Sequence, residues 1–297
     1  AEPAEAKATI HYHDIGDYLD REQKLKIVKE FKTFENPNFA LTTLQPNEHG
    51  DWISIRNDSF SAYIQLGDKD NKLNKYTYFI PFYSNGLKTQ RDSWCYNSNK
   101  TLLSKNIQET INFFNTESAR FIEEKRKNDK VESKSVLDFN DHKISWTRAL
   151  IWDAEKGKSH LYDEKNFRVC SYRPFFKQNL YFDRALNEMV YQIPKLFPHK
   201  ESSNLLICVP GAGDTKNFTC LITDYIPDLG FTGASQCFPL YYYEENNSTQ
   251  KGLFDTDDSQ KYVRRDAISD FILERAKQQY GFSAGSNTIS KEDIFYY

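Results

Sequence analysis

The sequence predicts an α+β fold, in which a mixed, largely helical first part precedes a β-rich second part. Apolar residues recur at three- and four-residue steps from Leu103 to Phe121, with Lys, Glu and Gln between them, which is the period of an amphipathic helix. After Ser145, short apolar runs return about every ten residues with turn residues between them, a spacing typical of strands. Aromatic residues make up 15% of the 297 residues and suit the half-buried surface of a sheet.

The first part of the chain predicts several small elements. Residues 10–13 alternate as in a strand, and because no hairpin mate lies beside them, we expect this strand to join a sheet elsewhere. Asp20 followed by Gln23 is a variant of the capping box, which starts a helix. Residues 40–66 predict two short strands, and the apolar run 76–83 predicts one buried strand.

The long helix is predicted to begin at Asn99, and residues 131–145 are interpreted as a linker or boundary. Near the C-terminus, residues 255–259 predict an acidic loop, and residues 263–272 predict a second amphipathic helix. The runs that predict strands are 149–152, 167–170, 180–182, 205–209, 218–222, 231–234 and 237–243.

Both ends of the chain suggest a piece of a longer protein. Ser290 and Asp293 form an S-x-x-D cap, which opens a helix, yet the sequence stops after one apolar turn at Tyr297. Residues 1–6 are interpreted as linker or vector residues and are left out of the fold prediction.

The composition excludes several classes of protein. The 42 acidic and 39 basic side chains give a net charge of −3, which argues against nucleic-acid binding by bulk charge and leaves room for a local basic groove. No stretch approaches the roughly 18 apolar residues of a membrane span, so no membrane partner is expected. The five cysteines are widely spaced without a C-x-x-C pair, which favours a reducing cytoplasm over disulfides or a zinc site.

The catalytic motifs that we sought are missing or poorly placed. Gly211-Ala-Gly213 follows a predicted strand, but it lacks a third glycine, so a β-turn is favoured over a cofactor loop. Glu123-Glu-Lys125 would point outward from a helix, and no nucleotide-triphosphate loop or G-x-S-x-G elbow occurs. The six histidines lack metal-ligand spacing. The sequence therefore predicts no catalytic or metal site.

Two segments carry side chains suited to contacts with DNA. The segment 85–92 is a glycine turn that presents Lys88, Thr89, Gln90 and Arg91 together. Hydroxyl and cationic side chains suit phosphates, while Gln and Arg can reach base edges.

The segment 168–184 carries four cations against the single acid Asp183, with aromatic residues between them. Basic residues among aromatics suit a DNA-contacting surface, but a core strand whose arginines reach the solvent would have the same sequence. Both interpretations remain open from the residues alone.

Four blocks of the chain occur in the same order as in a known family. They are HDIGDYLDREQKL (13–25), PNEHGDW (46–52), FYSNGLKTQRDSWCYN (82–97) and YRPFFKQNLYFD (172–183). In these blocks the chain resembles the region that follows the methyltransferase domain in type ISP restriction–modification enzymes. Those enzymes are single polypeptides that join a nuclease, a helicase-like translocase, an N6-adenine methyltransferase and a C-terminal target-recognition domain.

The resemblance implies a target-recognition region that binds double-stranded DNA without catalysing a reaction. It divides the chain into the end of the methyltransferase domain (1–35), a mixed α+β part (36–130) and a β-rich recognition part (131–297). The expected partners are DNA and the methyltransferase domain of the same polypeptide, in a monomeric enzyme of the prokaryotic cytoplasm. S-adenosylmethionine, ATP and Mg²⁺ are implied for the parent enzyme and none for this fragment.

The resemblance carries over to two residues of the first segment, and the chemistry of the side chains suggests the other roles in both segments. Gly86 and Thr89 match the G-x-x-T loop at the entry to recognition domains in related adenine methyltransferases. The expected phosphate contacts are Lys88, Arg91, Arg173 and Lys177. The expected base readers are Gln90, Gln178 and Asn179, and the DNA-binding set also includes Thr89 and Tyr172. Two alternatives stay open, which are a methyltransferase or nuclease in its own right, with 211–216 at a cofactor, and an interaction scaffold without DNA.

Overall fold

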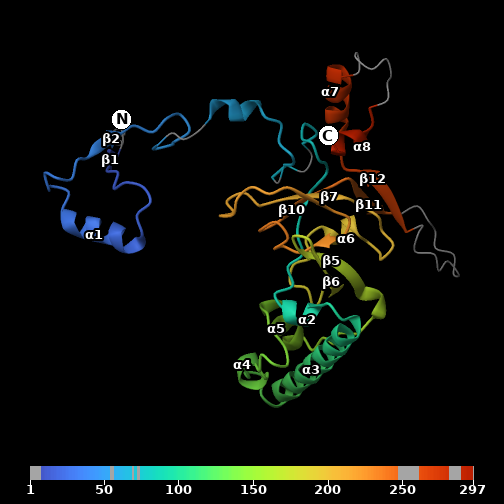
Figure 1. Cartoon of the computed structure of the whole chain (residues 1–297). Coiled ribbons are helices and arrows are strands. Elements are labelled where there is room, and N and C mark those ends of the chain that lie inside the picture. Colours follow the sequence, from blue (N-terminus) through green and yellow to red (C-terminus); the bar gives the residue numbers. More distant parts are fainter. Residues whose placement is uncertain are drawn as a thin grey trace, which may run out of the picture. The chain divides into compact units, whose positions relative to one another are not determined.

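The computed structural model describes residues 8–53, 57–68, 70–71, 74–246, 261–280 and 289–296. The chain forms two compact units, Ala1–Tyr63 and Ile64–Tyr297, which we describe separately. Helices and several small sheets together confirm the predicted α+β class (Figure 1). The three-part functional division stays a prediction. Within the described residues, every helix is too short or too polar to cross a membrane.

The first unit contains a two-stranded sheet and one helix. β1 (Ile10–Tyr12) pairs antiparallel with β2 (Thr42–Leu44), so the expectation of a sheet elsewhere is wrong, because the mate comes from later in the same unit. α1 (Arg21–Phe31) begins at the predicted capping box, in which the backbone N–H of Gln23 donates to Asp20 at 2.8 Å. Of the two strands predicted in 40–66, the described residues form β2 alone, followed by the 3₁₀ helix η1 (Asp58–Ala62).

The second unit contains the predicted long helix. α3 (Lys100–Lys127) begins at Asn99, whose side chain accepts two backbone N–H groups of the first turn. α4 (Ser133–Val136) and α5 (Arg148–Glu155) pack against it. The strand predicted at 149–152 is wrong, because Thr147 caps a helix there and apolar side chains four residues apart are buried against α3.

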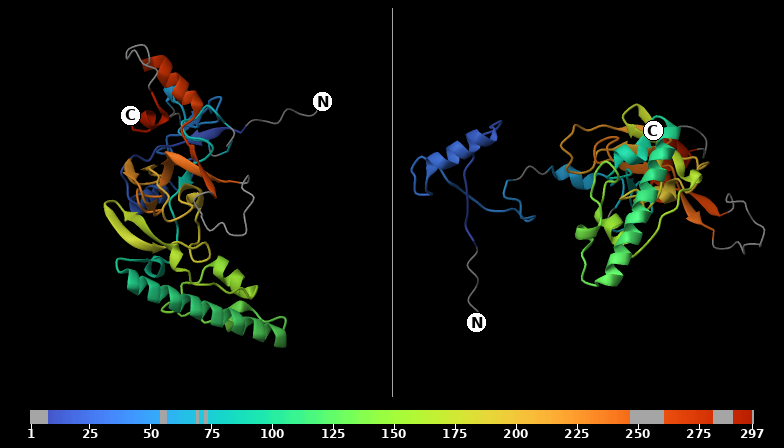
Figure 2. Two further views of the ribbon diagram at one scale, coloured as in Figure 1. Left: turned by 90° about the vertical axis from the view of Figure 1, so that its right-hand side faces the viewer. Right: turned by 90° about the horizontal axis from the view of Figure 1, so that it is seen from below.

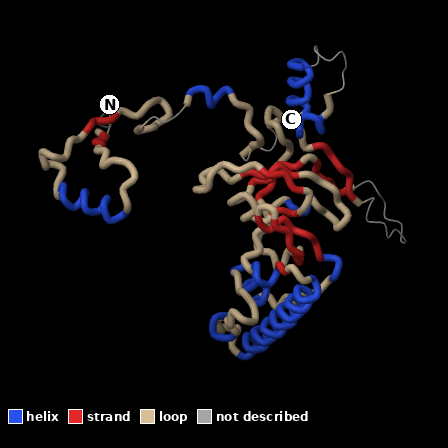
Figure 3. The backbone as a smooth tube through the Cα atoms, in the orientation of Figure 1, coloured by secondary structure: helices blue, strands red, loops and turns tan. Residues whose placement is uncertain are grey.

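Two four-stranded sheets lie between this helical part and the C-terminal helices (Figure 3). The first has the order β4-β6-β5-β9, in which β5 and β6 form an antiparallel hairpin and β9 runs parallel to β5. Its strands are β4 (Tyr96–Asn97), β5 (Phe167–Arg173), β6 (Phe176–Tyr181) and β9 (Ile226–Pro227).

The second sheet is fully antiparallel and has the order β3-β10-β7-β8. Its strands are β3 (Ser84–Asn85), β7 (Leu206–Val209), β8 (Leu221–Thr223) and β10 (Gln236–Pro239). One hydrophobic core joins the two sheets, since Cys170 and Leu180 of the first share it with Leu206 and Cys237 of the second. This shared core fixes the position of the β5–β6 hairpin relative to the rest of the unit.

The C-terminal part combines a hairpin with two helices. β11 (Tyr241–Glu245) pairs with β12 (Tyr262–Asp266), after which α7 (Asp270–Tyr280) and α8 (Lys291–Tyr296) follow. The single helix predicted over 263–272 is therefore wrong, because its first residues pair with β11. The cap predicted at Ser290 is confirmed, and the acidic loop 255–259 lies outside the described residues. The remaining short elements are α2 (Asp92–Cys95), η2 (Glu164–Asn166) and α6 (Ile193–Leu196).

Two of the predicted strands are loops in the structure. The run 76–83 is buried as predicted at Phe79, which shares a second core with Phe238 and Ile272, but it forms only an isolated bridge to Ile268. Pro81 interrupts the run, and proline cannot donate to a strand ladder. The run 231–234 turns sharply, with Gly233 at a φ of +81°.

Candidate nucleic-acid interface

Backbone hydrogen bonds hold the first residues of the loop 85–92 in place. The N–H of Leu87 donates to Pro227 O at 2.8 Å, and the N–H of Leu229 donates back to Leu87 O at 2.8 Å. A Cβ added at Gly86 would lie 2.5 Å from the carbonyl oxygen of Asp228, so only glycine fits this close approach. The predicted glycine turn is therefore a packed junction with β9.

The side chains of this loop divide into two groups. Lys88 is half-buried and Gln90 is exposed, with Gln90 at a φ of +59°. Thr89 is 1% exposed, and its hydroxyl donates to the carboxylate of Asp92. Of these three side chains, Lys88 and Gln90 therefore reach the solvent, as a contact with DNA requires.

Arg91 points into the protein. Its Nε donates to Ser145 O at 3.3 Å and its Nη2 to Thr147 Oγ1 at 2.9 Å, while Nη1 donates to the carbonyl oxygen of Leu186. The side chain is fully buried, and this burial lowers the pKa of the guanidinium. The phosphate contact expected of Arg91 finds no support in this geometry, because the cation instead ties three segments of the unit together.

Two carboxylates, Asp92 and Asp228, lie beside the turn of the β5–β6 hairpin. Arg173 Nη1 donates to Asp228 Oδ1 at 2.6 Å, and Tyr96 donates its hydroxyl to Asp228 Oδ2 at 3.0 Å. The hydroxyl of Tyr172 donates to Asp92 Oδ2 at 3.0 Å. Burial raises the pKa of Asp228.

This arrangement limits what Arg173 can offer to a phosphate. Its guanidinium lies 3.9 Å from the centre of the Tyr172 ring, and its Nη2 lies 3.7 Å from a second acid, Asp92. The side chain is 42% exposed, so it reaches solvent, but its charge is already compensated. The hydroxyl of Tyr172 is likewise already used, because it donates to Asp92.

Strand β6 of the hairpin carries the remaining predicted residues. Lys177 is exposed and its Nζ lies 3.9 Å above the Tyr225 ring, and among the described residues it forms no salt bridge. Asn179 donates its amide to Asn97 O at 3.1 Å and to Ser98 O at 3.0 Å, which joins β6 to the start of α3.

A bidentate contact with adenine requires the amide to donate as well as accept. The donors of Asn179 are already used, whereas Gln178 is half-buried on the same strand with no hydrogen bond of its side chain among those described. Of the two adjacent amides, Gln178 is therefore the better placed to read a base.

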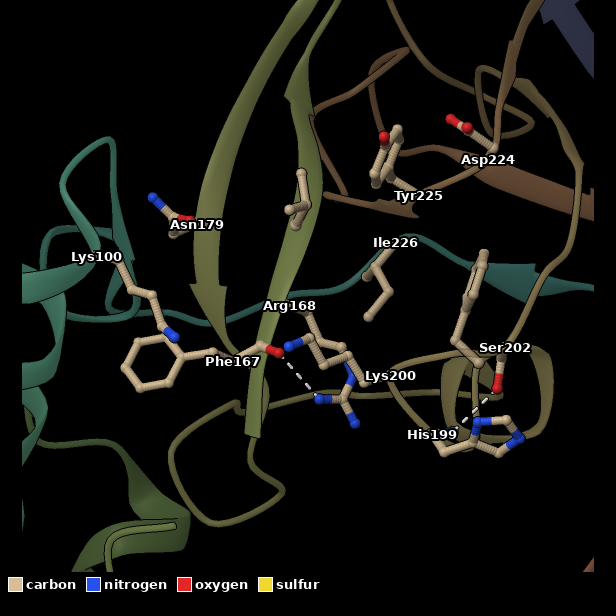
Figure 4. A pocket seen from close by; sticks show the side chains of 12 residues that line it. Lys100, Phe167, Arg168, Asn179, His199, Lys200, Ser202, Asp224, Tyr225 and Ile226 are labelled. Carbon is tan, nitrogen blue, oxygen red and sulfur yellow. Dashed lines mark hydrogen bonds between the residues drawn. The ribbon is translucent and has the colours of Figure 1, made fainter. Parts of the chain in front are cut away.

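Two hollows flank the segment Asp224–Tyr225. One, of ≈ 350 Å³, is lined by Lys100, Arg168, His199 and Lys200 together with Phe167, Asn179 and Tyr225 (Figure 4). The other, of ≈ 400 Å³, is lined by Arg173, Phe175, Phe176, Lys177 and Ile222. The cations that line the two hollows come from four separate segments, and Asp224 is the one acid among the lining residues.

The first hollow also contains residues that sequence reasoning missed. Lys100 and Lys200 lie far apart in the chain and share no motif with the hairpin, so only folding brings them together. Acids moderate their charge, since Lys100 Nζ lies 3.6 Å from Glu164 and His199 Nδ1 lies 3.5 Å from Glu201. Among the residues that the structure describes, no three metal-ligating side chains gather as a metal site would require.

The segment 211–216 is a turn between strands. The N–H of Asp214 donates to Gly211 O at 3.0 Å, and the chain passes from β7 to β8 with no helix between them. A cofactor loop needs a helix N-terminus after the glycines. The favoured interpretation as a β-turn is confirmed.

The site thus combines a packed glycine junction, an antiparallel hairpin and two hollows lined by cations. The chain belongs to the family of the Type ISP C-terminal specificity domain, whose family model matches residues 78–297. A search of curated proteins gives no match.

Three solved structures resemble the chain closely. The first is an "ATP-dependent Type ISP restriction-modification enzyme LlaBIII bound to DNA", with a TM-score of 0.74 and 32% identity over 98% of this chain. A nuclease-deletion mutant of the Type ISP enzyme LlaGI with a DNA substrate mimic matches with a TM-score of 0.68 and 32% identity over 88% of this chain. A DrdV–DNA complex matches with a TM-score of 0.74 and 25% identity over 97% of this chain. The chain spans only 17%, 23% and 26% of these proteins.

Proposed function

We propose that this chain selects the DNA sequence on which a type ISP restriction–modification enzyme acts. Its family and the relatives whose structures contain DNA support this proposal. The observation that carries it is strand β6 of the hairpin, where Lys177 lies on Tyr225 without a salt bridge among the described residues. The next residue, Gln178, has an available amide on the opposite face of the strand.

The two side chains have different tasks in this proposal. Lys177 contacts a phosphate, which fixes register on the duplex without reading sequence. Gln178 contacts a base edge and so contributes specificity. Lys88 and Gln90 divide the same two tasks at the surface of the loop 85–92.

Binding to duplex DNA at several salt concentrations tests this division. Lys177→Gln is expected to weaken binding to all duplexes alike and to reduce the slope of log K against log salt by about 0.9, the contribution of one phosphate. Gln178→Ala is expected to change the affinity for one base position by about 1–3 kcal/mol. Lys105→Gln is the matched control, because Lys105 is an exposed cation on α3, where it pairs with Glu109.

Unchanged binding by both hairpin variants would defeat the assignment of the hairpin as the DNA-contacting element. An equal loss in Lys105→Gln would show that binding depends on overall charge instead.

We further propose that methylation, translocation and cleavage belong to other parts of the parent polypeptide, which take up S-adenosylmethionine, ATP and Mg²⁺. This chain then takes no cofactor, docks against the methyltransferase domain of its own monomeric polypeptide and works in the prokaryotic cytoplasm. Titration calorimetry of the chain with S-adenosylmethionine is expected to give no binding heat. Saturable heat would favour a methyltransferase in its own right.

A further inference from the structure

The tip of the β5–β6 hairpin is unusual in both conformation and exposure. Arg173 pairs with Phe176, so Pro174 and Phe175 form a two-residue turn. Phe175 has a φ of +60°, in the left-handed region that glycine or asparagine normally occupies in such a turn. Its side chain is 94% exposed. A bulky aromatic residue in this conformation is a rare outlier.

Packing within the described structure does not explain this side chain. No ring contact involves Phe175 among the described residues, and the neighbouring Phe176 is itself 47% exposed. In the left view of Figure 2 the hairpin, in yellow-green, extends from its sheet toward the margin of the unit. Strained and exposed groups of this kind persist at binding sites, where a partner uses them.

The surroundings of the tip indicate the chemistry of that partner. Arg173 and Lys177 lie on the two strands that flank the turn, and both line the ≈ 400 Å³ hollow with Phe175. Asp228 and Asp92 already compensate the charge of Arg173, so Lys177 is the cation of this pair that remains for a partner. The partner therefore has an anionic group beside an apolar interior. Duplex DNA has this arrangement, since phosphates border each groove and stacked bases lie inside it. A two-stranded ribbon also fits a groove.

We propose that Phe175 is an apolar wedge, which inserts between two base pairs when the β5–β6 hairpin enters a groove of the bound duplex. Apolar side chains carried on such elements partly unstack a base step and kink the helix. Lys177 holds a phosphate beside the opened step. The left-handed backbone at Phe175 directs the ring outward from the turn. This inference rests on the proposed DNA-binding function and adds to it a local distortion of the duplex.

The probe is the 25-bp duplex that the wild-type chain enriches from a randomised pool, with 2-aminopurine placed at one position at a time. Wild-type protein is expected to raise the fluorescence at one base step, because unstacking relieves the quenching of this base. Phe175→Ala is expected to abolish that rise and to weaken binding about 5- to 150-fold, the range for loss of one base–aromatic stack. Phe175→Trp is expected to retain both properties.

Leu161→Ala is the matched control, because Leu161 is 83% exposed and lines neither hollow. Circular dichroism melting identifies any variant that fails to fold, and Phe175→Trp keeps the test informative in that case. Equal fluorescence and affinity for wild type and Phe175→Ala overturn the wedge while leaving the proposed function intact. If wild type enriches no sequence and shows no salt-sensitive binding, both the wedge and the proposed DNA-binding function are refuted.

Discussion

Arg91 offers the sharpest test of a structural role against a DNA-contacting role. The change is Arg91→Met, which keeps much of the side-chain volume and removes the guanidinium. Three groups of other segments lose the donor that Arg91 supplies, namely Ser145 O, Thr147 Oγ1 and Leu186 O, and the nearby Thr89 O loses a longer hydrogen bond of 3.4 Å. All three belong to segments that are distant from Arg91 in the chain.

The magnitude follows from burial. Removing one partner from a buried charged network costs about 3–5 kcal/mol, because the remaining polar groups stay buried without a partner. A protein of this size loses about 2–4 °C of melting temperature for each kcal/mol. We therefore expect Arg91→Met to melt roughly 6–20 °C below wild type.

Urea unfolding followed by circular dichroism measures the loss, and DNA affinity is measured well below both melting temperatures. Lys88→Met is the companion variant, since its half-buried side chain makes no described hydrogen bond and its effect on stability should stay within about 0.5 kcal/mol. We expect Arg91→Met to lose stability and Lys88→Met to lose affinity. The reasoning is refuted if Arg91→Met melts like wild type and binds DNA more weakly.

Three further changes have defined outcomes. Phe175→Gly should raise the free energy of unfolding by about 1 kcal/mol in urea titrations, because relief of the left-handed φ exceeds the entropy that glycine adds to the unfolded chain; a loss of stability would contradict the strain at this turn. Gly86→Ala should destabilise by about 1–3 kcal/mol or more, since its Cβ would meet the backbone of Asp228 at 2.5 Å, and unchanged melting would contradict that approach. Burial raises the pKa of Asp228, so the stability of wild type relative to Asp228→Asn should be greatest below the unfolded pKa of about 4 and decline as the pH rises through the raised folded value. Urea titrations between pH 3.5 and 7 should show this decline, and a difference that grows with pH would contradict it.

Local signals in the sequence predicted local structure well. The capping residues Asp20 and Asn99 start helices where expected, because their side chains satisfy N–H groups within the next turn. The apolar runs predicted as strands at 167–170 and 180–182 lie in or at the ends of the β5–β6 hairpin. A hairpin is also a local structure, because its two strands are neighbours in the sequence.

Elements that depend on contacts between distant parts of the chain were predicted wrongly. The strand-like run 149–152 became a helix because α3 offers it a surface, and residues 262–266 became a strand because β11 offers them a mate. Arg91 shows the same limit at the site. Its sequence neighbours do not distinguish a surface cation from one bound by carbonyl groups that only folding brings near.

The central claim is that this chain chooses a DNA sequence through side chains of the β5–β6 hairpin. Selection from a randomised duplex pool measures it most directly, with wild type and Gln178→Ala compared at the same salt. We expect wild type to enrich one short asymmetric sequence and Gln178→Ala to relax it at a single position. Two results would contradict the account. In the first, neither protein enriches any sequence over the input pool; in the second, both proteins enrich the same sequence with the same specificity at every position.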